Sequence, residues 1–99
     1  MAQRIEVIFR RSASEDIANI SYYVTTKGYP ENAKRFVDKL HKFGESLGVF
    51  PEKYPICRHK QFAKKKFHCA VFDKNYVFVY KIETTRIVIY NVIHAKRLI

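Results

Sequence analysis

The 99-residue chain has few of the residues that mark specialised classes of protein: two cysteines, three glycines, three prolines and no tryptophan. Two cysteines are too few for a disulfide scaffold, and Cys57 and Cys69 do not have the spacing of metal ligands. We therefore expect reduced thiols, with Cys69 in the core, and no metal or cofactor. With 47% hydrophobic residues, the composition is that of a globular domain and not of a disordered chain.

Long apolar runs and acidic residues are also scarce. No run approaches the roughly 18 residues of a membrane span, and the N-terminus lacks the apolar stretch of a signal peptide. We therefore expect a soluble, cytoplasmic protein that does not engage a membrane. Nine Asp and Glu stand against 19 Lys and Arg, which gives a formal net charge of +10. This excess favours a polyanion or an acidic protein as partner.

The N-terminal third is predicted to form a strand followed by a helix. β-forming residues alternate over residues 4–10 and predict the strand. Ser12 and Glu15 have the spacing of a capping box, in which each side chain satisfies a backbone amide at the helix start. Apolar residues then recur at helical spacing, and Gly28 supplies the stop. The first helix is expected over residues 13–27.

A second amphipathic helix follows after a short turn. Pro30 suits its first turn, and its apolar stripe continues to Leu47. Gly44 lies inside this helix and indicates close packing against a neighbour, since glycine is otherwise unfavourable there. The strongly basic segment 51–66 comes next and could contain a short strand at 56–59. The two helices are expected to form a helical hairpin.

Residues 67–94 carry three runs of Val, Ile, Phe and Tyr separated by short polar turns at 73–75 and 83–85. Strands joined this closely form an antiparallel meander. The predicted fold is therefore α+β, in the order β-α-α-β-β-β, with a mostly antiparallel sheet and the helical hairpin on one face. No linker divides residues 1–99, so we expect one domain.

The register of the meander decides which side chains share a face. If both turns are two-residue hairpins, Ala70 pairs with Val79, Lys81 with Val88 and Val79 with Tyr90. A change of one residue in either turn would exchange the faces of a strand. The face predicted to pack against the helices carries Phe67, Cys69, Val71, Phe78, Tyr80, Ile82, Ile87, Ile89 and Ile93.

The opposite face is predicted to gather the polar residues. Basic and aromatic side chains on a sheet suit phosphates and bases. Two histidines of this face could transfer protons near neutral pH, or be ordinary surface residues. The lysine run 64–66 suits either an electrostatic contact or a solvated turn. The face carries His68, Lys81, Arg86, Tyr90 and His94, set among Val77, Val79, Val88 and Val92.

Four stretches, taken in order, resemble one known family. They contain Ala13, Asp16-Ile17 and Tyr22-Tyr23; Pro30, Ala33, Arg35-Phe36, Leu40, Leu47 and Phe50-Pro51; residues 76–82; and residues 87–94 with Arg97. Together they resemble the RelE/ParE toxin superfamily of bacterial type II toxin–antitoxin systems, which includes plasmid stabilisation proteins. The resemblance implies the predicted fold, growth arrest as the output, and an antitoxin partner that wraps the toxin.

The resemblance implies two alternative activities. RelE-like members cut mRNA in the ribosomal A site, and our first hypothesis is such an endoribonuclease, with His94 or His68 transferring protons and Arg58 holding the phosphate. ParE-like members poison DNA gyrase without being nucleases, and the ending from His94 to Arg97 resembles theirs. An inactive member of the superfamily is a third possibility. Residues expected to contact nucleic acid or the target are Lys64, Lys65, Lys66, Lys81, Arg86, Tyr90, Lys96 and Arg97.

Overall fold

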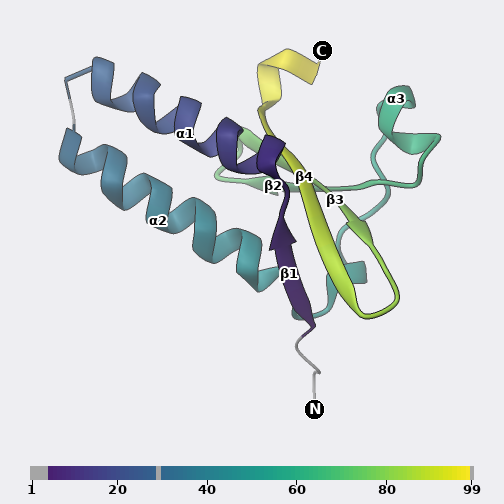
Figure 1. Cartoon of the computed structure of the whole chain (residues 1–99). Coiled ribbons are helices and arrows are strands. Elements are labelled where there is room, and N and C mark those ends of the chain that lie inside the picture. The colour runs from purple at the N-terminus through teal and green to yellow at the C-terminus, as the bar shows by residue number, and fades with distance from the viewer. Residues whose placement is uncertain (1–4, 29, 99) are drawn as a thin grey trace.

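The computed structural model describes residues 5–28 and 30–98, with side chains described as far as Lys96. Four strands form one sheet in the order β1-β4-β3-β2, and the α1–α2 hairpin covers one of its faces (Figure 1). This confirms the predicted α+β fold. The elements are β1 (Glu6–Phe9), α1 (Arg11–Thr26), α2 (Pro30–Ser46), the 3₁₀ turn η1 (Pro51–Lys53), α3 (Lys60–Ala63), β2 (His68–Phe72), β3 (Tyr76–Ile82), β4 (Arg86–His94) and the 3₁₀ turn η2 (Ala95–Leu98).

The start of α1 differs from the prediction. β1 pairs in parallel with β4, and the Arg10 amide continues this ladder by donating to the Ile89 carbonyl at 2.9 Å. The helix begins at once, with Arg10 as its N-cap and no side-chain cap. The capping box is therefore wrong: Ser12 lies inside the first turn, and its hydroxyl donates to the Tyr90 carbonyl at 2.5 Å. Pairing with β4, and not a local cap, sets where α1 starts.

The two glycine predictions for the helices are confirmed. Gly28 adopts a left-handed φ of 89° just after α1, a conformation that favours glycine. Gly44 is buried in α2, where an added Cβ would lie 2.5 Å from the ring of Phe9. The absence of a side chain at this position lets α2 approach β1 closely.

The register of β2 is shifted by one residue from the prediction. The first turn has three residues, because Asp73 and Lys74 both take left-handed conformations, with φ of 53° and 63°. Ala70 consequently pairs with Phe78 instead of Val79. Since side chains alternate along a strand, this shift turns the whole of β2 over. The separate strand considered at 56–59 is reduced to one antiparallel bridge, Ile56 with His68.

The register of β4 is predicted correctly at one end only. Lys81 pairs with Val88, as expected, but Val79 pairs with Asn91 because a bulge inserts Tyr90 as an extra residue. Asp16 of α1 fastens this bulge, since its Oδ2 accepts from Asn91 Nδ2 and from the Val92 amide, both at 3.0 Å. Beyond the bulge the faces of β4 are exchanged relative to the prediction.

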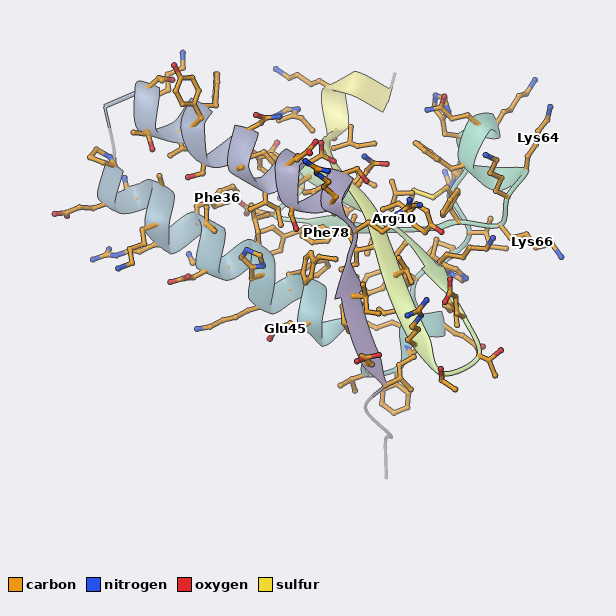
Figure 2. The ribbon with its side chains drawn as sticks, in the orientation of Figure 1. Arg10, Phe36, Glu45, Lys64, Lys66 and Phe78 are labelled. Atoms are coloured by element: carbon orange, nitrogen blue, oxygen red, sulfur yellow. A yellow bond between two sulfur atoms is a disulfide. The ribbon has the colours of Figure 1, made fainter. Side chains whose placement is uncertain are left out.

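The core under the helices is therefore partly as predicted. Phe36 of α2 and Phe78 of β3 both lie between the helices and the sheet (Figure 2). Burying a large apolar side chain completely contributes about 1.5–3 kcal/mol. The predicted members Phe67, Cys69 and Ile93 belong to a second cluster on the other face, and Val71 is exposed. Confirmed members of the core are Phe78, Tyr80, Ile82, Ile87 and Ile89.

Candidate target-binding surface

The second face of the sheet is covered by residues 54–67, which we call the covering segment. The sheet stands between the α1–α2 hairpin and the helix α3 of this segment (Figure 1). Two backbone hydrogen bonds fasten it to the start of β2: Cys57 N donates to Phe67 O at 2.8 Å, and Cys69 N donates to Pro55 O at 3.2 Å. The segment lacked a clear periodicity in the sequence, and its position depends on these long-range contacts.

A disulfide joins Cys57 of the covering segment to Cys69 of β2. The expectation of reduced thiols is therefore wrong. Cys57 is almost fully buried and Cys69 is partly buried, so both contribute to the packing of this face. The expected place of Cys69 in the core under the helices is also corrected, because the shifted register of β2 turns its side chain to the second face.

The covering segment has a small hydrophobic core of its own. Phe67 and Cys57 pack on Val77 and Val79 of β3. Phe67 makes edge-to-face contacts with Phe62 of α3 and with Tyr90, at centroid distances of 6.1 and 4.8 Å. Such aromatic pairs contribute about 0.5–1.5 kcal/mol beyond their buried area. The core and the disulfide hold the outer part of the segment against the sheet.

The outer part, residues 58–66, forms what we call the basic lobe. Its cationic side chains are all exposed and it contains no Asp or Glu. The two ion pairs found in the described part of the chain, Arg11–Glu15 and Arg86–Glu83, lie outside it. Lys64 and Lys66 extend away from the body of the protein (Figure 2). The structure thus brings the predicted residues Arg58, Lys64, Lys65 and Lys66 together on one protrusion.

Two further cations lie over aromatic rings of the same face. The guanidinium of Arg10 is 4.6 Å from the ring centroid of Tyr90, and Lys81 Nζ is 5.9 Å from that of Phe67. Contacts of this kind contribute about 0.5–1 kcal/mol at exposed sites. Lys81 and Tyr90 were predicted to share this face. Arg10 was not predicted, because only the parallel pairing of β1 with β4 brings it to Tyr90.

Arg86 lies apart from this group in the β3–β4 turn. Its Nε donates to Glu83 Oε1 at 2.8 Å. This hydrogen bond and the carboxylate charge raise the pKa of the Arg86 guanidinium above its ordinary value. An arginine engaged by a neighbouring acid is less available to an anion than the unpaired cations of the basic lobe.

His68 lies on the face that the helices cover, contrary to the prediction. The one-residue shift of β2 places it opposite Tyr80, and the two rings stack with centroids 5.3 Å apart. Its Nδ1 donates to the Tyr54 carbonyl at 2.7 Å. Burial raises the pKa of the neighbouring Tyr80 well above its ordinary value, and the Tyr80 hydroxyl donates to the Pro51 carbonyl at 2.6 Å. These contacts give His68 a packing role.

His94 also lies on the helix side, because the bulge at Tyr90 exchanges the faces of β4. It is opposite Tyr76, with an edge-to-face centroid distance of 5.2 Å, and its Nδ1 accepts from the Lys96 amide at 3.2 Å. His94 borders a groove of about 400 Å³ between α1 and the end of β4. The exposed Lys96 also lines this groove, whereas the side chain of Arg97 lies outside the described part of the chain.

The two histidines are far apart. His68 pairs with Tyr80 and His94 with Tyr76, so four residues of β3 and two strand spacings separate them. This corresponds to about 13 Å along the strands and about 10 Å across them, or roughly 16 Å in all. Arg58 belongs to the basic lobe, over the other face. The three proposed catalytic residues therefore do not converge on one phosphate.

Metal binding and membrane insertion find no support in the part of the chain that the structure describes. Across residues 5–28 and 30–98, no three His, Cys, Asp or Glu side chains group as metal ligands would. No helix within these ranges combines the length and the apolar character that crossing a bilayer requires.

Comparison with known proteins places this geometry in a family. Residues 7–99 match the family model described as ParE toxin of type II toxin–antitoxin system, parDE. The chain belongs to the ParE toxin family. It is also similar to a solved structure, "Chromosomal ParDE TA system from P. aeruginosa", with a TM-score of 0.75 and 11% identity over 92% of this chain and 96% of that one. No curated protein matches the chain.

The ParE family match confirms the resemblance to the RelE/ParE superfamily and extends over nearly the whole chain. At 11% identity, the solved structure shows that the fold is shared. In this ParE-family chain the sheet face opposite the helices is not bare: its own covering segment occupies it and presents the basic lobe. The candidate surface therefore consists of the basic lobe with Arg10, Lys81 and Tyr90 beside it.

Proposed function

We propose that this ParE-family protein is a toxin that arrests growth by binding DNA gyrase without performing catalysis. The observation that carries the proposal is the separation of His68 from His94. General acid–base catalysis needs groups within hydrogen-bond reach of the reacting atoms, about 2.6–3.2 Å. Two groups roughly 16 Å apart cannot both reach one phosphodiester. His68 is moreover engaged by the Tyr54 carbonyl and the Tyr80 ring.

The experiment compares the two activities in one culture. We expect induction of the protein to arrest growth and to yield gyrase-linked DNA breaks, while mapping of mRNA 5′ ends shows no new cuts in the ribosomal A site. The variant His68→Gln/His94→Gln should remain toxic, provided that its circular dichroism spectrum matches that of the wild type. Growth arrest without gyrase-linked breaks would overturn the proposal.

The second candidate is ribosome-dependent mRNA cleavage, our first hypothesis from the sequence. It is favoured by the five exposed Lys and Arg residues of the basic lobe, which suit an RNA backbone. In this case His94 and Lys96, which border one groove, would act on the RNA. A-site cleavage that is lost in His94→Gln but retained in the control His59→Gln would select this candidate. Induction without growth arrest would indicate an inactive member.

We further propose that an antitoxin neutralises this protein in the cytoplasm by covering part of α1. The adjacent side chains of Tyr22 and Tyr23 are 73% and 58% exposed. Exposed apolar surface of this kind marks interaction sites, and Tyr23 also lines the groove beside His94. The net charge of +10 favours an acidic antitoxin segment. Tyr22→Ser/Tyr23→Ser should weaken antitoxin binding in a pull-down while growth arrest persists; unchanged binding would exclude this surface.

A further inference from the structure

The basic lobe concentrates positive charge more strongly than any other short stretch of the chain. Five of its nine residues are Lys or Arg, and all five are exposed. The nearest acids in the sequence are Glu52 and Asp73, on either side of the covering segment. Charges of one sign this close together repel one another and destabilise the lobe unless an anion binds there. The arrangement thus indicates an anionic ligand.

The lobe is held in place by the rest of the fold. The disulfide from Cys57 to Cys69 fixes one end, and the Phe67 amide closes the other by donating to the Phe62 carbonyl at 3.1 Å. Phe62 packs into the second hydrophobic cluster beneath the lobe. A cationic surface fixed before binding loses little conformational entropy when it meets its ligand.

The composition of the exposed surface distinguishes between anionic ligands. Protein interfaces rely on buried aromatic or aliphatic anchors, and the exposed side chains of the lobe are all polar. Single-stranded nucleic acids are bound by stacking their bases on aromatic rings. Phe62 is turned toward the cluster, and the exposed ring of His59 lies against Phe62, 5.8 Å between centroids. What remains available is a set of point charges, which matches the phosphate backbone of a duplex.

We propose that the basic lobe binds the phosphate backbone of duplex DNA, without regard to base sequence. Lys and Arg contacts to phosphates release condensed counterions, so the logarithm of the affinity falls with the logarithm of the salt concentration by about 0.9 per contact. Up to five contacts give a slope as steep as about −4.5, or roughly a 500-fold loss of affinity between 50 and 200 mM salt. The proposal goes beyond the choice between gyrase and the ribosome, because the protein alone should bind.

The test measures binding of the full-length protein to a fluorescent 20-base-pair DNA duplex of arbitrary sequence by anisotropy, over a range of salt concentrations. We expect the variant Lys64→Gln/Lys65→Gln/Lys66→Gln to reduce the magnitude of the slope by about 2–3. The matched control, Lys34→Gln/Lys39→Gln/Lys42→Gln, removes the same charge from exposed positions of α2 and should leave the slope nearly unchanged.

Several results would overturn the proposal. If both triple variants reduce the slope equally, net charge and not the lobe drives binding. No saturable binding at about 50 mM salt would show that the lobe does not grip DNA. Tighter binding to single-stranded DNA, duplex RNA or polyglutamate than to the DNA duplex would assign the lobe to that ligand instead. Because neither gyrase nor ribosomes are present, failure here is distinguishable from failure of the proposed function.

Discussion

Breaking the bond between Cys57 and Cys69 should destabilise the protein by an amount that the loop length sets. The two cysteines are 12 residues apart in sequence. In the chain-entropy treatment, closing a loop of this length lowers the entropy of the unfolded chain by about 10 cal/mol/K, which stabilises the folded state by about 3 kcal/mol at 25 °C. For a domain of this size, that loss corresponds to a fall in Tm of roughly 12 °C or more.

The assay is urea denaturation of the wild type with and without a phosphine reductant. The variant Cys57→Ala/Cys69→Ala, which has no bond to reduce, serves as the control and should be insensitive to the reductant. The loss should be strongest locally, so amide hydrogen exchange is expected to rise in the covering segment before it rises in α1 and α2. The lobe depends on this bond, whereas the core under the helices does not contact either sulfur.

One result would refute this reasoning. If reduction exposes two free thiols and yet changes the free energy of unfolding by less than about 0.5 kcal/mol, the bond does not constrain the unfolded chain as the loop-closure argument requires. In that case the hydrogen bonds between the covering segment and β2 would be sufficient to hold the segment.

Three other changes test separate parts of the fold. Gly48→Ala should lower the free energy of unfolding by about 2–3 kcal/mol, because the added methyl group would lie 2.5 Å from a backbone carbonyl just before β1. Gly44→Ala meets a side chain that can move, so an equal or greater loss there in urea denaturation would contradict this reasoning. Asp16→Ala removes the acceptor of two hydrogen bonds from the β4 bulge and should cost about 2–3 kcal/mol; an unchanged Tm would show that the bulge does not need it. Finally, the raised pKa of Tyr80 means that the unfolded chain loses this proton first as pH rises above about 10, so stability should fall by up to about 1.4 kcal/mol per pH unit. Tyr80→Phe should show a correspondingly shallower fall in denaturation measured from pH 9 to 11, and an identical pH profile would be evidence against the buried phenol.

The predictions that succeeded depended on local patterns repeated over many residues. Apolar spacing located α1 and α2, and the alternation of β-forming residues located β2, β3 and β4. Gly28 and Gly44 were interpreted correctly because glycine has few structural reasons to occur at a helix end or inside a helix. The match of fold and family followed from the order of these elements.

The errors arose where one residue decides the direction of many. A three-residue turn in place of a two-residue turn moved His68 to the helix side, and the bulge at Tyr90 moved His94. Both features depend on contacts between distant parts of the chain, since Asp16 of α1 fastens the bulge and left-handed residues shape the turn. Parity along a strand makes such errors large, because every side chain beyond them changes face.

The sequence by itself determined the type and order of the elements, the α+β architecture and the positive charge, because these depend on residues close together in the chain or on composition alone. Only the tertiary structure decided which face each histidine occupies, that Arg10 meets Tyr90, and that Cys57 reaches Cys69. These outcomes require strand register and the path of the covering segment, which are set by packing between residues that are far apart in sequence.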